Sequence, residues 1–319
     1  MYKSFFKLRS NPFSVNPDPR FLCMTAHAKE ALACLTYGIH GRKGFVVLTG
    51  EVGTGKTTLL NKLQEWLRRH NMRSAFIFNP RLEVEQFLAF MMADFGIPGT
   101  ENATKSQLLM RLNNWLLDRA RAGETAVLIV DEAQNLTPEM LEEIRLLTNL
   151  ETSSEKLLQI VLSGQPELDA KLHQPQLRQL RQRITLRSRT YPLNPSETRD
   201  YITQRLQVAG SAEPIFSPAA VELVHLHAAG IPRVINLICE HSLITAFAEQ
   251  QRQVSAEIVQ AVAEDLELIP GSPGEASGTA GASEQPKTEL LAALNAVEKL
   301  SRRLREAEAG VPKKGTATQ

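Results

Sequence analysis

The stretch GFVVLTGEVGTGKTTLL, residues 44–60, decides how the rest of the chain is interpreted. Its four apolar residues from Phe45 to Leu48 predict a buried strand, and apolar residues at helical spacing follow Thr58. Between them, residues 50–57 match the phosphate-loop pattern G-x-x-x-x-G-K-[ST]. A strand that leads through a glycine loop into a helix is the context that this motif requires. The sequence therefore predicts a nucleotide-binding α/β fold.

The glycine loop suits a triphosphate for a direct physical reason. Its glycines allow backbone conformations that other residues resist, so N–H groups can turn inward, and the next helix adds its positive end. Lys56 would reach the β- and γ-phosphates, and the Thr57 hydroxyl would bind Mg²⁺. The predicted cofactors are ATP and Mg²⁺. The predicted nucleotide-binding residues are Gly50, Glu51, Val52, Gly53, Thr54, Gly55, Lys56, Thr57 and Thr58.

A second apolar run, AVLIV at residues 126–130, ends in two adjacent carboxylates, Asp131 and Glu132. A fully apolar run is typical of a central strand in a parallel sheet that is covered on both faces. Two carboxylates at its end would be poorly placed unless they faced a cation. We expect Asp131 to hold Mg²⁺ through water and Glu132 to orient and polarise the attacking water.

Residues 157–168, LLQIVLSGQPEL, predict another buried strand with a polar end. Either Ser163 or Gln165 could lie between the two carboxylates and the γ-phosphate. The alternative is a plain exit from strand to turn, since Gly-Gln-Pro is typical of turns.

Arginines are concentrated in LRQLRQRITLRSR, residues 177–189. A solvated basic face is the ordinary interpretation of such a run. One arginine could instead act on a neighbouring subunit's nucleotide as an arginine finger, or the stretch could contact the phosphates of nucleic acid. The position directly after the predicted sensor strand favours the finger.

From Asn194 to Leu268 the pattern is helical throughout. Asn194, Pro195 and Glu197 form a capping signature, and Arg233 lies in the first turn of a later helix, where its charge would need an anion partner. The predicted domains are an N-terminal arm (1–24), a P-loop domain (25–193), a small all-helical lid (194–269), a flexible linker (270–287), an amphipathic helix (288–310) and a disordered tail (311–319).

The two ends of the chain carry further apolar signals. Phe5, Phe6 and Phe13 are expected to be buried against the domain that follows the arm, or to flank a nucleotide base. The apolar residues of the 288–310 segment follow a 3-4 spacing that is typical of a helix seeking a partner, which makes a homo-oligomer a reasonable expectation. They are Leu290, Ala293, Val297, Leu300, Leu304 and Ala307.

Bulk composition limits the classes of protein to consider. The 319 residues have a net charge of +1, with 43% hydrophobic and 22% charged residues, so no global field steers the chain to nucleic acid or a membrane. Cys23, Cys34 and Cys239 are scattered and odd in number, without metal or disulfide spacing. There is neither a signal-like start nor an apolar run of ~20 residues. We expect a cytoplasmic protein without a transmembrane segment.

Taken in order, these motifs resemble the AAA+ ATPases of the general secretion pathway protein A (ExeA-like) family. The resemblance covers residues 1 to about 268. Besides the phosphate loop, it rests on MYxxFFxL, NPF (11–13), PDPRFL (17–22), YGI (37–39), IVDEAQNL (129–136), SGQPEL (163–168), LRQLRQRI (177–184) and GIPRVINLIC (230–239).

The resemblance implies roles for individual residues. Asp131 and Glu132 correspond to Walker B, Gln165 to sensor 1 and Arg233 to sensor 2. Arg183 is the first choice for the finger, with Arg181 and Arg178 behind it. The implied partner is a protein of a secretion or export system, which could hold the chain at the inner membrane.

The process served is open at this stage. Full-length members of the family carry a membrane span and a periplasmic wall-binding domain, and this chain is expected to have neither. The same core is similar to ATP-dependent target-selection proteins of transposons, which polymerise on DNA. The hypotheses are a secretion ATPase, a nucleotide-gated DNA-binding assembler, and a scaffold that binds ATP without turnover. Intact Lys56 and Glu132 argue against the scaffold.

Overall fold

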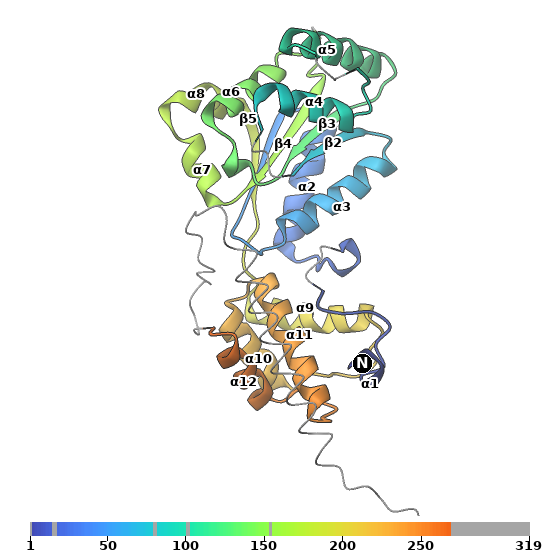
Figure 1. Ribbon diagram of the computed structural model, residues 1–319, viewed down its shortest axis with the longest axis vertical. Helices are drawn as coiled ribbons and strands as arrows, with labels where there is room; N and C mark the ends of the chain where they lie inside the picture. Colours follow the sequence, from blue (N-terminus) through green and yellow to red (C-terminus); the bar gives the residue numbers. More distant parts are fainter. Residues whose placement is uncertain (1, 15–17, 79–81, 100–102, 153–154, 269–319) are drawn as a thin grey trace, which may run out of the picture. The chain divides into compact units, whose positions relative to one another are not determined.

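The computed structural model describes residues 2–14, 18–78, 82–99, 103–152 and 155–268, which form two compact units (Figure 1). One unit holds residues 18–193 together with 231–233. The other holds residues 2–14, 194–230 and 234–268. The linker, amphipathic helix and tail predicted after residue 269 lie outside the described residues.

The larger unit is built on a parallel sheet of five strands in the order β2-β3-β4-β1-β5 (Figure 1). This arrangement confirms the predicted α/β class. The strands are β1 Phe45–Thr49, β2 Arg73–Ile77, β3 Ala126–Val130, β4 Leu158–Gly164 and β5 Ile184–Arg189.

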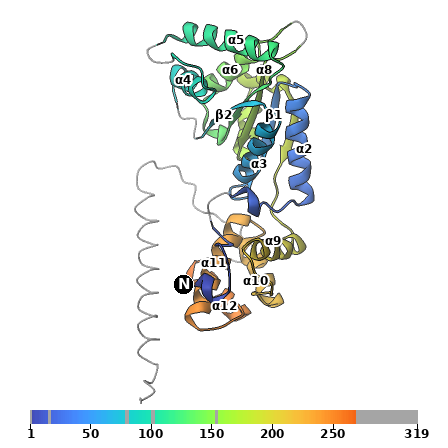
Figure 2. The same cartoon turned by 90° about the vertical axis from the view of Figure 1, so that its right-hand side faces the viewer.

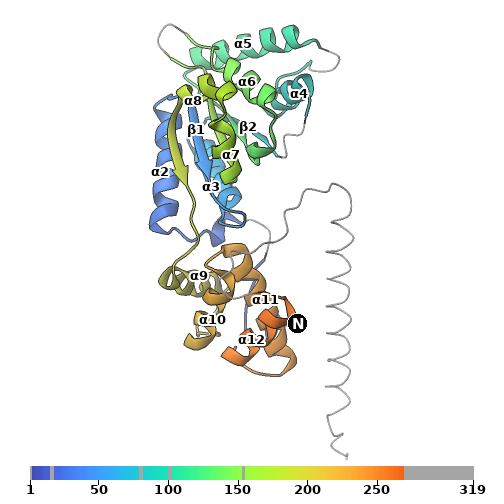
Figure 3. The same cartoon turned by 90° about the vertical axis from the view of Figure 1, so that its left-hand side faces the viewer.

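Helices cover both faces of this sheet, and alternate side chains of each strand enter the two layers. In β1, Val46 and Leu48 pack with α2 (Ala26–His40) and α3 (Lys56–Arg69), whereas Phe45 and Val47 join the cluster on the opposite face (Figures 2 and 3). That second layer comprises α4 Val84–Asp94, α5 Lys105–Arg121, α6 Pro138–Leu147, α7 Pro166–Leu172 and α8 Arg178–Arg183. Short 3-10 turns lie at η1 Pro19–Phe21, η2 Ala133–Asn135 and η3 Pro175–Leu177.

The strands differ from the prediction at two places. The strand predicted over 157–168 ends at Gly164, because Gln165 is the N-cap of α7 and Pro166 occupies its first turn. Strand β5 was not predicted at all, since its alternating half-buried and exposed residues were interpreted only as a basic run.

The smaller unit contains α9 Pro195–Val208, α10 Pro218–Ala228, α11 Pro232–Ala248 and α12 Ala256–Asp265. The capping signature at Asn194 is confirmed: its side chain accepts the Glu197 N–H at 2.9 Å, and the Glu197 carboxylate accepts the Asn194 N–H at 2.9 Å. Among the described helices, none has the length and apolar content needed to cross a bilayer.

Residues 2–14 of the predicted arm, with α1 at Tyr2–Phe5, pack within the helical unit, so the expectation that Phe5, Phe6 and Phe13 join the P-loop domain is wrong. Phe13 is fully buried and meets Phe216 edge-on, with ring centroids 6.0 Å apart. Phe5 lies 5.5 Å from Phe247 in a similar geometry. These aromatic pairs account for where the arm docks.

Candidate nucleotide-binding site

The predicted site residues converge where β1, β3 and β4 end. Strand β4 lies between β3 and β1, with Val130 opposite Leu162 and Thr49 opposite Gly164. The glycine loop, the Asp-Glu pair and Gln165 therefore leave the sheet along the same edge. In open parallel sheets, ligands bind outside the carboxyl ends of the strands.

The glycine loop needs its glycines for two different reasons. Gly53 and Gly55 have φ angles of 78° and 94°, which other residues adopt at a cost. At Gly50 the reason is space, because a Cβ there would lie 2.0 Å from Thr190 Oγ1 and 2.8 Å from the Thr190 carbonyl oxygen. Thr190 also shares a 2.7 Å hydrogen bond with Thr54, so the end of β5 supports the loop from outside.

Lys56 begins α3 and is buried beneath the loop. Its ammonium donates to the carbonyl oxygens of Gly50 at 2.8 Å and Glu51 at 3.0 Å. Burial lowers the pKa of Lys56, and the nearby carboxylates of Glu132 and Asp131 partly oppose that effect. A buried ammonium whose hydrogen bonds in the described part of the chain all go to carbonyl oxygens is well suited to receive an anion, so the cradle fits a phosphate group.

Asp131 forms the centre of the site. Its buried carboxylate accepts the Thr57 hydroxyl at 2.9 Å and the Ser163 hydroxyl at 2.8 Å. The described residues contain no group of three or more His, Cys, Asp and Glu side chains that could hold a metal. One carboxylate and one hydroxyl do fit Mg²⁺, which usually binds few protein groups and completes its shell with phosphates and water.

Glu132 has a left-handed backbone, with φ 54° and ψ 37°, an uncommon conformation for this residue type. Its Oε2 atom accepts the side-chain amide of Gln165 at 3.3 Å and that of Gln134 at 2.6 Å. The structure thus brings Gln165 to Glu132 and Ser163 to Asp131. Sequence reasoning missed Gln134, which follows Glu132 by two residues and carries no local signal of this contact.

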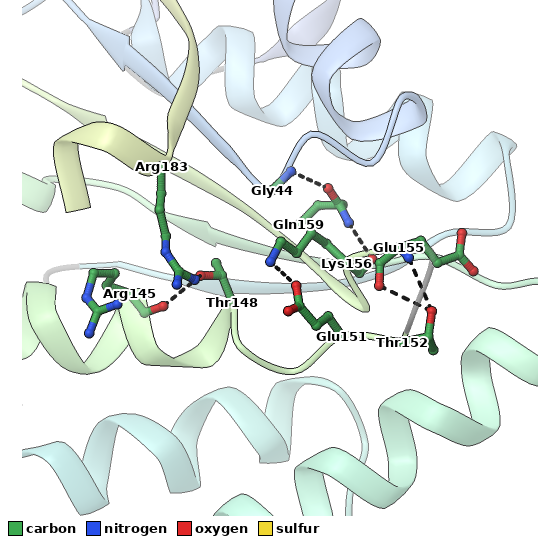
Figure 4. Close-up of polar contacts among 9 residues, drawn as sticks. All are labelled: Gly44, Arg145, Thr148, Glu151, Thr152, Glu155, Lys156, Gln159 and Arg183. Carbon is green, nitrogen blue, oxygen red and sulfur yellow. Dashed lines mark hydrogen bonds and ion pairs between the residues drawn. The ribbon is translucent and has the colours of Figure 1, made fainter. Parts of the chain in front are cut away.

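Arg183 lies near the amino ends of the parallel strands, away from the phosphate loop, and takes part in the polar contacts of Figure 4. It precedes β5, whose first residue pairs with Phe45, the start of β1. Its guanidinium donates to Thr148 Oγ1 at 2.7 Å. Arg178 and Arg181 are exposed on α8. The structure therefore does not bring these arginines to the phosphate loop of their own chain.

Arg233 clusters with the larger unit and approaches the glycine loop through its backbone. Its N–H donates to the Gly53 carbonyl oxygen at 3.2 Å. A Cβ at Gly53 would lie 2.8 Å from the Arg233 Cβ, so a second requirement for glycine applies at that position.

Comparison with known proteins agrees with this geometry. The family model described as "AAA domain" matches residues 39–172. The chain carries an AAA domain. It is 47% identical over 254 residues to general secretion pathway protein A of Aeromonas hydrophila, an alignment that covers 80% of this chain and 46% of that protein. The chain thus spans about half the length of this relative. The predicted resemblance is confirmed.

Two solved structures share the fold at low sequence identity. The Aeropyrum pernix ORC2 protein, in ADPNP and ADP complexes, has a TM-score of 0.62 at 17% identity, with 80% of this chain and 71% of that chain covered. Drosophila ORC bound to DNA has a TM-score of 0.62 at 20% identity, with 98% and 80% covered. At these identities the likeness concerns the fold alone.

Proposed function

We propose that this protein is an ATPase that binds ATP with Mg²⁺ at the carboxyl edge of its sheet and hydrolyses it to drive or gate a conformational or assembly step. The observation that carries the proposal is the Asp131 carboxylate, which joins Thr57 after the phosphate loop to Ser163 at the end of β4. This is the arrangement needed to hold a cation beside phosphates.

Each residue has a distinct part in the proposed reaction. Lys56 binds the β- and γ-phosphates, and Thr57 and Asp131 hold Mg²⁺, which neutralises the charge on the phosphates when bound. Glu132 orients a water molecule and accepts its proton while the water oxygen bonds to the γ-phosphorus. The bond from that phosphorus to the bridging oxygen breaks, and ADP and phosphate leave. Gln165 senses the γ-phosphate, a role that its hydrogen bond to Glu132 supports.

The remaining arginines act on the nucleotide from two directions. Arg233, whose backbone meets the loop at Gly53, serves as sensor 2. Arg183 serves as the finger for a neighbouring subunit, because it lies at the amino ends of the strands and the phosphate loop of its own chain lies at their carboxyl ends. Both assignments follow from the resemblance and from these positions.

The proposed process is protein secretion or cell-envelope export, through a protein partner and a homo-oligomer. Its basis is the identity to the secretion pathway protein, 46% of which the alignment covers. The alternative is a nucleotide-gated DNA assembler, which the exposed arginines of α8 favour. Duplex DNA that stimulates turnover several-fold would support the assembler, and unchanged turnover would favour the secretion role.

Two variants test the ATPase proposal. Lys56→Ala should abolish ATP binding, because the site loses its main contact to the phosphates. Glu132→Gln should bind ATP normally and hydrolyse it at least ~100-fold more slowly, the loss expected for a positioned base. Binding is measured with a fluorescent ATP analogue and turnover by phosphate release. Normal turnover in Glu132→Gln would remove the proposed role of that carboxylate.

A further inference from the structure

One side chain at the site has no place in the chemistry described so far. Gln134 lies in the η2 turn, two residues after Glu132, and its amide makes two contacts in opposite directions. The Nε2 group donates to Glu132 Oε2 at 2.6 Å, and the Oε1 atom accepts the backbone N–H of Gln165 at 3.1 Å. The amide thus bridges the carboxylate after β3 and the junction between β4 and α7.

The end of β4 leaves room for this bridge. A Cβ added at Gly164 would lie 2.8 Å from Gln134 Oε1 and 2.9 Å from Leu168 Cδ2. Gly164 lies outside the left-handed region, so the close approach of Gln134, and not a backbone requirement, explains a glycine here.

The turn that carries Gln134 is itself held in place. The Lys171 ammonium on α7 donates to the backbone carbonyl oxygens of Gln134 and of Leu136, the latter at 2.7 Å. Glu132, at the start of the same turn, has the left-handed backbone described above. A strained conformation of this kind persists only where its surroundings determine it, and these contacts supply that support.

We propose that Gln134 is a positioning residue for ATP hydrolysis: it fixes Oε2 of Glu132, leaves Oε1 to take the proton from water, and ties that carboxylate to the segment carrying Gln165. The inference rests on the proposed ATPase function. Among the described residues, Oε1 of Glu132 has no hydrogen-bond partner, whereas Oε2 has two. A base held at one oxygen keeps its orientation without losing the other oxygen for chemistry.

Gln134→Met tests this role, because methionine is close in size and lacks both amide contacts. The variant should lose at least ~10-fold in kcat, less than the ~10²–10⁴-fold attributed to a positioned base, because the carboxylate itself remains. Its KM and its affinity for a fluorescent ATP analogue should stay within about twofold of the unchanged protein, since Gln134 contacts no predicted phosphate-binding residue. Gln134→Glu should lose more, because it places a like charge against Glu132. Gln207→Met, on the exposed face of α9, is the matched control and should leave kcat unchanged.

A double-mutant cycle separates positioning from independent effects. In a Glu132→Gln background, Gln134→Met should reduce the residual kcat by no more than about twofold, because the carboxylate it orients is gone. An equal loss in both backgrounds would overturn the proposal, as would full kcat in Gln134→Met or a joint loss of ATP binding and turnover. If the unchanged protein binds ATP without hydrolysing it, the ATPase proposal fails and this inference fails with it.

Discussion

Glu240 is a half-buried carboxyl group of the helical unit that faces two hydrogen-bond donors. The Tyr2 hydroxyl and the Asn11 amide donate to it at 2.9 Å and 3.0 Å. Burial raises the pKa of Glu240, and the two hydrogen bonds oppose part of that rise. An acid with a raised pKa in the folded state contributes stability that is present below its ordinary pKa and lost as pH rises through the folded value.

Glu240→Gln should therefore change stability in a pH-dependent way. The variant keeps an oxygen that can accept from Tyr2 and Asn11 but carries no charge to bury. Relative to the unchanged protein, its melting temperature should rise between pH 5 and pH 8, by about 2–4 °C for each ~1 kcal/mol of free energy recovered. Glu213→Gln, at an exposed position, is the control and should show no such trend. A difference that is the same at both pH values would contradict the argument.

At the residue scale, short sequence motifs were enough to predict which polar side chains meet at the nucleotide-binding site. Lys56, Thr57 and Asp131 stand next to recognisable strands, and parallel strands end on a common edge, so their meeting followed from the sequence. Gln134 could not be found this way. Its contacts depend on a turn that folds back beside Gly164, and no spacing along the chain reveals that approach.

At the scale of elements, Gln159 joins the starts of β1 and β4. Its buried side chain accepts the Gly44 N–H at 2.9 Å and donates to the Lys156 carbonyl oxygen at 2.9 Å (Figure 4). These contacts satisfy two backbone groups where the parallel ladder begins. Buried polar side chains are rare in a strand of this kind, and both the oxygen and the nitrogen of this amide are hydrogen-bonded.

Removing that side chain should weaken the sheet. Gln159→Ala leaves the Gly44 N–H without its acceptor, and each buried unsatisfied group costs about 1–3 kcal/mol. Urea unfolding should show a loss of stability in that range, whereas Gln179→Ala, on the exposed side of α8, should change it by less than ~0.5 kcal/mol. Equal effects of the two substitutions would show that Gln159 has no special role in the ladder.

Element prediction succeeded where periodicity was strong and failed where tertiary context decided. The central strands are continuous apolar runs and were found. Strand β5 is an edge strand in which half-buried and exposed residues alternate. Because several of its residues are arginines, this alternation was interpreted as a basic run and not as a strand. The end of β4 was placed too late, because the helix that begins at Pro166 follows the strand after a single residue.

At the scale of the whole molecule, the sequence predicted a P-loop domain followed by helices, and the docking of the arm was the part it missed. Aromatic residues near a chain start can pack on any apolar surface. Phe13 meets Phe216 and Tyr2 meets Glu240, partners more than two hundred residues away along the chain. Such contacts carry no local signal.

The position of Arg183 makes assembly testable. Strand β1 has five residues, so at ~3.3 Å per residue its first and last Cα atoms lie about 13 Å apart. Arg183 is at the start of the neighbouring strand and the phosphate loop is at the end of β1. A finger at this place would complete the site of another copy. Turnover per subunit should then rise with protein concentration.

Arg183→Ala should remove most turnover and leave ATP affinity nearly intact, because a finger acts chiefly in the transition state. Mixing Arg183→Ala with Lys56→Ala should restore part of the activity, since an interface can pair an intact pocket with an intact arginine. Steady-state phosphate release over a range of mixing ratios measures this. If the mixtures stay inactive and Arg183→Ala also loses ATP binding, Arg183 acts within its own subunit and the assembly argument fails.

Thr148→Val separates the finger from a purely structural arginine. Thr148 accepts the Arg183 guanidinium and donates to the Arg145 carbonyl oxygen at 2.7 Å, and valine keeps its shape without either contact. If Arg183 serves only to donate its hydrogen bond to the buried Thr148 hydroxyl, Thr148→Val should lower turnover as much as Arg183→Ala does. If Arg183 acts across an interface, Thr148→Val should keep most turnover, because the Arg183 guanidinium remains free to reach the neighbouring nucleotide.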